Sequence, residues 1–391
     1  MYNKRRFGQK TGRINNFQHS NKRKTAVFRD VSKFINRAKP NEISTYVAKH
    51  AFEDFALDHR IKKNVFNRGY KEPSPIQDQT IPYILLNKDL VGIANTGTGK
   101  TVAFVLPLLN KIINDKKEKA IIVAPTRELA IQINQELIKL AYGLGIYSVC
   151  TVGGMPIFRQ ISNLRQNHNF IIGTPGRIKD LIDRGCIKMT DFRTIVLDEA
   201  DRMLDMGFVN DMKFLITSMP KERQILFFSA TVSGEINKII KEFLKDPVSI
   251  SVKTRDTASS VDQDIIRIAQ SNKFDILHGL LTKPEFSKVL VFGRTKYGVE
   301  RLSSSLVQKG IKADSIHGNK NHNQRQRALK SFKDSSLNVL VATDVAARGL
   351  DIPDVSHVIN YDLPSTYEDY IHRIGRTGRG GKPGKALTFI E

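Results

Sequence analysis

The stretch LVGIANTGTGKTVAFVLPLL, residues 90–109, decides the fold. Its first four residues are apolar and have the pattern of a buried strand, and residues 102–109 have the pattern of an apolar helix. The glycine-rich turn between them, residues 94–101, brings backbone amides and a helix amino end together, an arrangement that binds phosphate. Ala94 stands where the usual motif has its first glycine. The stretch therefore predicts a strand, a phosphate-binding loop and a helix of an α/β fold.

The residues of this turn have distinct expected roles. Gly97 and Gly99 permit unusual φ angles and a close approach of the backbone to the ligand. The Lys100 ammonium is expected to neutralise the β- and γ-phosphates, and the Thr101 hydroxyl to hold magnesium. The predicted nucleotide-binding loop comprises Thr96, Gly97, Thr98, Gly99, Lys100 and Thr101.

A second apolar run ends in carboxylates. Residues 194–197 (TIVL) have the pattern of a buried strand, so Asp198 and Glu199 are expected at its carboxyl end, where open α/β sheets bind ligands. A carboxylate there suits Mg²⁺, and the next carboxylate can orient or deprotonate a water that attacks a phosphate. For an acid pair alone, a capped and solvated turn is the alternative, and the phosphate loop upstream argues against it.

Strands and helices alternate along two stretches of the chain, which predicts two parallel sheets covered by helices on both faces. The polar residues 251–264 separate the stretches and are predicted to contain a linker. The strand candidates are 91–94, 120–124, 148–152, 170–173, 194–197 and 224–228, then 265–269, 288–292, 312–316, 338–342, 357–361 and 386–390. The expected division is a basic, largely disordered extension (1–50), a first domain (51–252), a linker (253–262) and a second domain (263–391).

The charge balance points to a polyanion. The 391 residues include 62 Lys and Arg against 39 Asp and Glu, a net charge of +23. This excess favours nucleic acid as a partner, with a basic surface that binds nothing as the alternative. The extension is especially basic and is expected to attract phosphate backbones or to act as a targeting signal, and a short helix is expected within residues 31–48.

Cysteine usage and hydropathy narrow the class of protein. The two cysteines, Cys150 and Cys186, have no CxxC spacing, which argues against zinc and against a disulfide framework. No apolar run approaches 18 residues, so neither a membrane span nor a secretory signal is expected. A reducing compartment, the cytoplasm, is the expected location.

The second domain has no phosphate loop of its own, but it has HRIGRTGR at residues 372–379. These residues contain three arginines at three-residue spacing. Arginine pairs bidentately with phosphate, and an arginine inserted from a separate domain can stabilise the charge that develops in phosphoryl transfer. A solvated nucleic-acid patch is the alternative.

Together the motifs resemble the DEAD-box ATP-dependent RNA helicases, in the family's order over residues 52–391. The matching segments are 94–101, 125–130 (PTRELA), 174–177 (TPGR), 198–201 (DEAD), 229–231 (SAT), 343–351 and 372–379. The amino-acid sequences of segments 317–320 and 343–351 are most similar to those of the bacterial RhlE-like subgroup. The resemblance implies two RecA-like domains in tandem and RNA-dependent hydrolysis of ATP with Mg²⁺. It also implies local separation of short RNA duplexes or remodelling of RNA–protein complexes, with little sequence preference.

The resemblance also implies roles for individual residues at the nucleotide. Residues 69–77 are similar to the family's adenine-reading segment, in which the Gln77 amide offers a donor and an acceptor to the base. Phe52 stands where the family stacks an aromatic ring on the base, with a core position beside Phe55 as the alternative. Asp351 resembles the residue that contacts the ribose.

Catalytic and coupling roles follow in the same way. Asp198 is expected to hold magnesium through water and Glu199 to activate the attacking water. Arg376 and Arg379 match the family's arginine fingers, and His372 with Arg373 is expected to support the domain interface. The expected coupling set, which links the nucleotide state to RNA, is Asp201, Ser229 and Thr231.

The RNA contacts implied by the resemblance are glycines, hydroxyls and arginines, which suit phosphate and sugar better than bases. They are Pro125, Thr126, Arg127, Gly153, Gly154, Thr174, Gly176 and Arg177 in the first domain, and Arg294, Thr295, Thr343 and Gly349 in the second. Ribosomal or RNA-decay partners are compatible with the family, and the residues do not choose between them.

Two departures from the family pattern stand out. His322 occupies a position that is usually Gln, with the expected Arg325 three residues later, and the chain ends at Glu391 where relatives commonly continue. A DNA translocase on the same scaffold and an ATP-gated RNA clamp or annealing chaperone remain as alternative functions. The RNA substrate, the pathway and the oligomeric state are not predicted.

Overall fold

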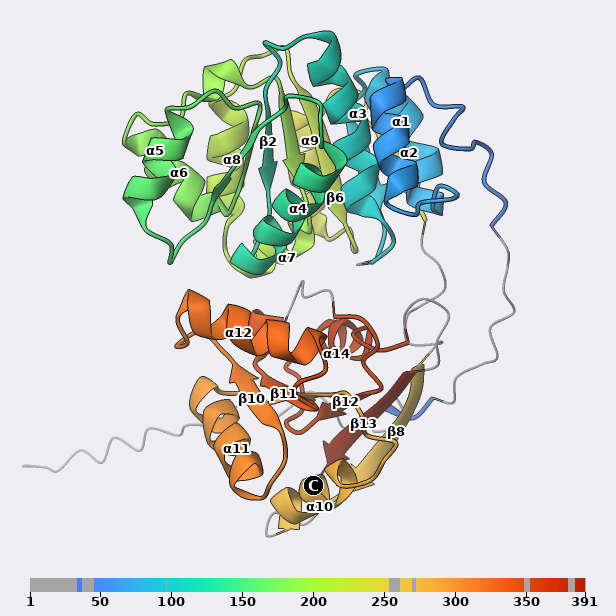
Figure 1. Ribbon diagram of the computed structural model, residues 1–391, viewed down its shortest axis with the longest axis vertical. Helices are drawn as coiled ribbons and strands as arrows, with labels where there is room; N and C mark the ends of the chain where they lie inside the picture. Colours follow the sequence, from blue (N-terminus) through green and yellow to red (C-terminus); the bar gives the residue numbers. More distant parts are fainter. Residues whose placement is uncertain are drawn as a thin grey trace, which may run out of the picture.

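The computed structural model shows two lobes, each built around one sheet (Figure 1). None of the helices in the described parts of the chain is long and apolar enough to cross a membrane. The described residues are 34–36, 46–95, 97–252, 261–268, 272–347, 352–378 and 384–390. Most of the predicted extension and linker, as well as Thr96, Gly349, Asp351 and Arg379, therefore lie outside the described residues.

The first lobe contains a seven-stranded sheet in the order β3-β4-β2-β5-β6-β1-β7, and its neighbouring strands are parallel. Parallel strands need crossover connections, and the helices between them supply these. The strands are β1 Leu90–Ile93, β2 Ala120–Val123, β3 Ser148–Thr151, β4 Phe170–Gly173, β5 Thr194–Leu197, β6 Gln224–Ser229 and β7 Val248–Ser251.

Helices cover both faces of this sheet because the strands are apolar on both sides. Along β2, Ala120 and Ile122 belong to one core cluster, whereas Ile121 and Val123 belong to the other. Alternate side chains of a strand point to opposite faces, so each face has its own core. One face packs against α1 His59–Asn67, α2 Pro75–Leu85, α3 Lys100–Asn114 and α4 Arg127–Leu140. The other packs against α5 Ile157–Leu164, α6 Pro175–Asp183, α7 Ala200–Asp205, α8 Val209–Thr217 and α9 Gly234–Phe243.

The second lobe has a six-stranded parallel sheet in the order β10-β11-β9-β12-β13-β8. Its strands are β8 Val261–Arg267, β9 Val289–Phe292, β10 Ala313–Ile316, β11 Val339–Ala342, β12 His357–Asn360 and β13 Gly384–Ile390. One face packs against α12 His322–Lys333, α13 Asp344–Ala347 and α14 Tyr367–Ile374, and the other against α10 Lys273–Leu281 and α11 Lys296–Gln308.

The predicted parallel-sheet α/β class is confirmed, and every predicted strand overlaps an observed one. Two local predictions need correction. Residues 248–251 form β7, which the sequence reading missed because the run is short and half polar. Strand β8 begins at Val261, so the last two residues of the predicted linker belong to the second sheet. Most of residues 31–48, where a short helix is predicted, lie outside the described residues, and the described Asn36 pairs as an isolated bridge with Gln263.

Asp89 ties three strands of the first sheet together just before β1. Its carboxylate accepts hydrogen bonds from the amides of Ile225 (2.7 Å) and Lys245 (2.8 Å), and its carbonyl accepts one from Val248 (2.9 Å). Because the side chain is buried, both amides depend on it for a partner.

Replacing Asp89 with alanine is expected to lower the free energy of unfolding by about 3 kcal/mol, because two amides lose hydrogen bonds to a charged group. Urea unfolding followed by circular dichroism measures the loss. The exposed neighbour Lys88→Ala is the control and should change little. Equal stability of the two variants would contradict this role.

Candidate functional site at the carboxyl edges of the two sheets

The predicted motifs of the first lobe gather at one edge of its sheet. Parallel strands all end at the same edge, and the phosphate loop, PTRE, GG, TPG, DEAD and SAT segments follow β1, β2, β3, β4, β5 and β6 in turn. That edge faces the second lobe (Figure 1). The fold thus brings segments from residues 94 to 231 into one surface.

The phosphate loop has the backbone conformation for which its glycines were singled out. Gly97 and Gly99 have φ of 85° and 94°, in the left-handed region that favours glycine. Space also requires Gly99, because a Cβ there would lie 2.4 Å from Nε2 of Gln77 and 2.9 Å from Oγ of Ser74. Gly99 is the N-cap of α3, so the loop leads directly into the amino end of that helix.

Ser74 and Gln77 hold the loop from the other side. Oγ of Ser74 donates to the carbonyl of Thr98 at 2.7 Å, and Nε2 of Gln77 donates to the carbonyl of Gly99 at 3.1 Å. Oε1 of Gln77 accepts from the Ser74 amide at 3.0 Å. Both ends of the Gln77 amide are therefore bonded to protein. Base reading by Gln77 stays a prediction, and the structure adds that this residue clamps the phosphate loop.

Phe52 lies in the core beside Phe55, which was the alternative to stacking on a base. Its side chain is 0% exposed and packs edge-on against Phe55 and Tyr70, with ring centroids 6.1 and 6.4 Å away. In this structure it is a core residue and presents no face to a base. Stacking on a base stays a prediction, and it requires the ring to leave this packing.

The two adjacent carboxylates emerge at the end of β5 as predicted, and both are buried. Burial raises the pKa of Asp198 to about 6, with the Lys100 charge opposing it. Burial also disfavours the charged form of Glu199, but the charges of Arg202, Lys100 and Arg376 outweigh it and hold the pKa of Glu199 below its usual value. Glu199 is therefore ionised at neutral pH, the state that a water-activating group requires.

Lys100 lies close enough to influence both carboxylates. Its side chain is buried and its Nζ donates to the carbonyl of Ala94 at 3.0 Å. The ammonium therefore sits inside the loop that it follows, where it completes an electropositive cradle for an anion.

Arg202 connects the carboxylates to the other lobe, and the sequence reading missed it. Its Nη1 donates to Oε2 of Glu199 at 2.9 Å, and its Nη2 donates to the carbonyl of Val345 in the second lobe at 3.3 Å. An arginine three residues after a glutamate at a helix start is a recognisable pairing signal. Only the fold shows that the same guanidinium reaches across the cleft.

The predicted coupling residues are hydrogen-bonded to one another. Oδ2 of Asp201 accepts from the amides of Ala230 (3.0 Å) and Thr231 (2.9 Å) and from the Thr231 hydroxyl (3.1 Å). Oγ of Ser229 donates to the Thr231 carbonyl at 2.7 Å and accepts from the Asp201 amide at 3.3 Å. The Asp201 carboxylate thus joins the segments after β5 and β6 through these hydrogen bonds.

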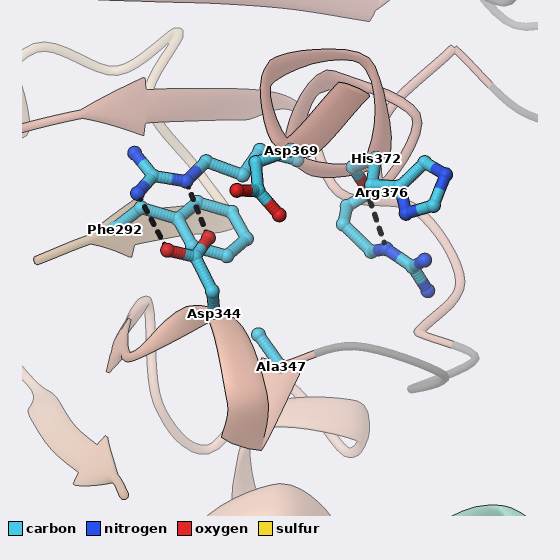
Figure 2. Close-up of a pocket in the computed structure, with 7 residues that line it drawn as sticks. Phe292, Asp344, Ala347, Asp369, His372 and Arg376 are labelled. Carbon is cyan, nitrogen blue, oxygen red and sulfur yellow. Dashed lines mark hydrogen bonds and ion pairs between the residues drawn. The ribbon is translucent and has the colours of Figure 1, made fainter. Parts of the chain in front are cut away.

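Arg376 of the second lobe lies within electrostatic reach of Glu199, because its charge contributes to lowering the pKa of that carboxyl. The side chain is 6% exposed, and Nε donates to the carbonyl of His372 at 3.2 Å (Figure 2). The predicted partner Arg379 lies outside the described residues.

Arg373 has a different role from the one predicted. It is 2% exposed and pairs bidentately with Asp344 (2.5 and 2.8 Å), and it also donates to the Asp362 carbonyl (2.6 Å) and to Oδ1 of Asn360 (3.2 Å). These partners all belong to the second lobe. Arg373 therefore fixes α14 against α13 and β12, and the expectation that it supports the domain interface is corrected.

The predicted RNA contacts of the first lobe form a continuous rim. Arg127 lies on the glycine pair, where a Cβ at Gly154 would be 2.1 Å from its Nη1, and Arg177 donates to the carbonyl of Met155 at 3.3 Å. Gln160, which the sequence reading missed, donates to the carbonyls of Val152 and Met155 at 3.1 and 3.3 Å. The glycine loop is therefore held in place from both sides.

The other members of the predicted RNA set differ in how accessible they are. Pro125 and Thr126 are buried, and the Thr126 hydroxyl accepts from the Leu129 amide to cap α4. Thr174 and Gly176, at the start of α6, are half-buried and exposed, and the Thr174 hydroxyl makes no capping bond to its helix.

In the second lobe, the predicted RNA contacts also follow strands. Arg294 is exposed after β9 and its amide donates to Oδ2 of Asp362 at 2.8 Å, whereas the Thr295 hydroxyl caps α11 by accepting from the Gly298 amide at 3.0 Å. Thr343 follows β11 and is half-buried. These residues follow the carboxyl ends of strands in the second sheet, as their counterparts do in the first.

An ion pair joins the lobes beside this rim. Nη2 of Arg325 lies 2.9 Å from Oε1 of Glu128, and the two side chains are 12% and 5% exposed. His322, one turn earlier on α12, has its pKa lowered by burial and by the charges of Arg127 and Arg325, which outweigh that of Glu128. At the unusual position, the imidazole is therefore neutral at neutral pH.

Comparison with known proteins adds a direct observation to this geometry. The DEAD/DEAH box helicase model matches residues 74–239, and the helicase conserved C-terminal domain model matches residues 272–381. The ATP-dependent RNA helicase CshA of Bacillus subtilis is 46% identical over 341 residues, which are 87% of this chain and 69% of that protein. The chain belongs to the DEAD-box ATP-dependent RNA helicase family.

Other relatives of this DEAD-box helicase agree. CshA of Listeria monocytogenes is 47% identical over 87% of the chain, and the match spans 66% of that protein's length, slightly less than two thirds. Solved structures of Saccharomyces cerevisiae Dbp5 with RNA and ADP BeF3, and of Mss116p with single-stranded RNA and AMP-PNP, are each 31% identical to it. Dbp5 has a TM-score of 0.76, with 87% of this chain and 89% of that chain covered. Mss116p has a TM-score of 0.80, with 91% and 77% covered. The RecA-like architecture of both lobes is therefore confirmed.

Two conservative substitutions in the DEAD motif are expected to change stability in opposite directions. Asp198→Asn removes a buried charge, and because burial raises the Asp198 pKa from 3.8 to about 6, the ligand-free chain should gain up to about 3 kcal/mol at pH 8. Asp201→Asn should lose about 1–3 kcal/mol because an amide oxygen cannot replace both carboxylate oxygens. Urea unfolding at pH 8 measures both. Shifts of the same sign would contradict the contrast.

Proposed function

We propose that this helicase hydrolyses ATP in a catalytic centre assembled from both lobes when RNA binds. The observation that carries the proposal is the surroundings of Glu199. Lys100 and Arg202 of the first lobe and Arg376 of the second all lower its pKa. Because groups from both lobes set the charge of the water-activating carboxylate, hydrolysis depends on how closely the lobes approach. RNA bound across both carboxyl edges favours that approach.

The phosphate loop is the proposed site of the ATP phosphates. Gly97, Thr98 and Gly99 supply backbone amides, and Lys100 neutralises phosphate charge. Glu199 orients and deprotonates the attacking water, while Arg376 stabilises the charge that develops on the transferred phosphate. Arg379 and Asp351 are proposed as second arginine and ribose contact from their place in the family motifs.

Mg²⁺ fits the residues at this site. Asp198 and Thr101 supply hard oxygen atoms, and Mg²⁺ characteristically uses one or two such protein ligands together with waters and phosphates. Burial disfavours the charge of Asp198, as its raised pKa of about 6 shows, so a cation there compensates a real electrostatic cost. When bound, the ion neutralises phosphate charge, and Asp198 and Thr101 are the residues that hold it.

The RNA strand is proposed to lie along the rim from Arg127 through the glycine pair to Arg177, and onward to Arg294 and Thr343. Dbp5 and Mss116p, which share the fold, are bound to RNA in their solved structures. Arginines, glycines and hydroxyls contact phosphate and sugar, so binding is largely independent of sequence. Holding the strand across both lobes separates short duplexes locally or remodels RNA–protein complexes.

The finer predictions extend this proposal. With the linker shortened by the start of β8, the lobes are proposed to correspond to residues 51–252 and 261–391, joined by 253–260, and the cytoplasm is the proposed location. Ribosomal or RNA-decay partners fit the family without being identified. Both bacterial relatives named above are CshA proteins, so the RhlE-like subgroup stays a prediction.

Glu199→Gln is expected to retain ATP binding and to lower RNA-stimulated turnover by about 10²–10⁴-fold, because an amide cannot accept the proton of the attacking water. Release of phosphate with and without RNA measures turnover, and a fluorescent ATP analogue measures binding. Glu222→Gln, an exposed site on the same lobe, is the control. Undiminished RNA-stimulated hydrolysis in the Glu199→Gln variant would refute the assignment.

Breaking the Glu128–Arg325 pair is expected to raise the RNA concentration that half-saturates ATP hydrolysis. Each single Ala variant leaves one charge buried and unpaired at the lobe interface. The costs of the two single variants should therefore sum to more than the cost of the double variant. A coupling energy of about 0.5–3 kcal/mol is expected from the double-mutant cycle. Arg327→Ala, an exposed residue of the same helix, serves as the control. Additive effects would show that the pair does not contribute to approach of the lobes.

A further inference from the structure

Residues 34–36 precede the first lobe in the sequence, yet they are attached to the second lobe. Strand β8 is at the edge of the second sheet, and Asn36 pairs with Gln263 on it in antiparallel fashion. The Asn36 amide donates to the Gln263 carbonyl at 3.0 Å, and the Gln263 amide donates to the Asn36 carbonyl at 2.7 Å. Addition of an extended segment to an exposed sheet edge is a common mode of peptide recognition.

Phe34 anchors this segment in the core of the second lobe. Its side chain is 0% exposed, and its ring meets Tyr370 edge-on with centroids 4.7 Å apart. The Tyr370 hydroxyl donates to Oε1 of Gln263 at 3.0 Å, so the same tyrosine contacts both the aromatic ring and the strand that pairs with the segment. Ile35, between the two anchored residues, is 50% exposed. Phe34 itself has a 3-10 helical conformation, and the chain pairs with β8 only two residues later, at Asn36.

The chain is anchored again, on the first lobe, ten residues later. The Tyr46 hydroxyl donates to Oδ2 of Asp78 at 2.5 Å, and the amides of Lys49 and His50 donate to the same carboxylate at 2.8 and 3.1 Å. Asp78 is 1% exposed and adjoins Gln77, which clamps the phosphate loop. This end of the connection is thus fixed beside the ATP site.

Two anchors so close in sequence limit how far the lobes can separate. Ten residues span at most about 33–36 Å when fully extended. Docking of Phe34 is therefore compatible with the arrangement in which Glu128 meets Arg325 and Arg202 meets the Val345 carbonyl. It opposes wide separation of the lobes, in addition to the covalent linker on the other side of residue 252.

We propose that the groove formed by β8 and Tyr370 is a docking site for an aromatic residue that lies two positions before a residue paired with the strand edge, and that its occupant is this chain's own Phe34. Docked, the segment acts as a second, releasable connection between the lobes. Release lets the lobes spend more time apart, and the RNA concentration needed to bring them together rises with the fraction that is apart. This inference goes beyond the proposed function, because it concerns a contact that determines how much RNA is needed to stimulate ATP hydrolysis.

The docking itself is tested without nucleotide or RNA, by hydrogen–deuterium exchange of the Gln263 amide in the full chain. Phe34→Ala should accelerate exchange about 100-fold, the effect expected from losing a buried phenyl ring. Ile35→Ala is the matched control and should leave exchange unchanged. Equal exchange in the Phe34→Ala and unaltered chains would overturn the docking site.

A second variant tests the connection without altering Phe34 or the core around it. Inserting twenty Gly and Ser residues between positions 41 and 42 lengthens the span from ten to thirty residues, which lowers the local concentration of the segment at the groove about fivefold. The same insertion between positions 10 and 11 is the control. The Gln263 amide should exchange about fivefold faster only with the first insertion, and equal exchange in the two would overturn the connection.

The effect on RNA response is measured as the RNA concentration that half-saturates ATP hydrolysis. Phe34→Ala and the 41/42 insertion should raise it about threefold or more, whereas Ile35→Ala and the 10/11 insertion should not. An unchanged or lowered RNA requirement in both test variants would overturn the tethering role. If RNA fails to stimulate even the unaltered chain, the proposed function is refuted, and the exchange experiment still decides the docking.

Discussion

A buried carboxylate, Glu199, on which positive charges from both lobes act is the feature around which the site is arranged. Glu199 is removed from water, and an isolated ionised carboxyl in such surroundings is strongly disfavoured. Lys100 and Arg202 compensate it from the first lobe, and Arg376 contributes from the second. Charges from both lobes therefore act on the same buried carboxyl. Its surroundings connect the carboxyl end of β5 with the large-scale arrangement of the chain.

Around that centre, the first lobe transmits position through short hydrogen-bonded links. Ser74 and Gln77 fix the carbonyls of the phosphate loop, so a change in the loop reaches α2 directly. Asp201 joins the ends of β5 and β6 through Thr231 and thus links the nucleotide side of the sheet to its neighbouring strand. Because the strands are parallel and end at one edge, each of these links covers only a few ångströms. A rigid sheet with short polar bridges at its edge can respond as a unit.

The second lobe contributes a rigid platform and a surface for attachment. Arg373, buried and bonded to Asp344 and to the Asp362 carbonyl, holds the end of α14 and so fixes the start of the turn that carries Arg376. On the far edge of the same sheet, β8 and Tyr370 take up Phe34. Helix α14 therefore carries the tyrosine that receives the amino-terminal segment, and the turn directly after it carries Arg376, whose charge acts on Glu199. Any shift of this helix relative to the first lobe affects both contacts.

Local pattern was sufficient to predict the parallel sheets, nearly all strand positions and the motif residues at the strand ends, because strand periodicity and glycine turns are properties of neighbouring residues. The polar edge strand β7 and the early start of β8 lacked that apolar signal. Contacts between residues far apart in the chain left no trace in local sequence. Burial of Phe52, the reach of Arg202 to Val345, the Glu128–Arg325 pair and the docking of Phe34 are of this kind. The sequence by itself determined the chemistry available at the sheet edges, whereas only the tertiary structure decided which charges share a buried environment, because burial and electrostatic compensation depend on neighbours brought together by folding.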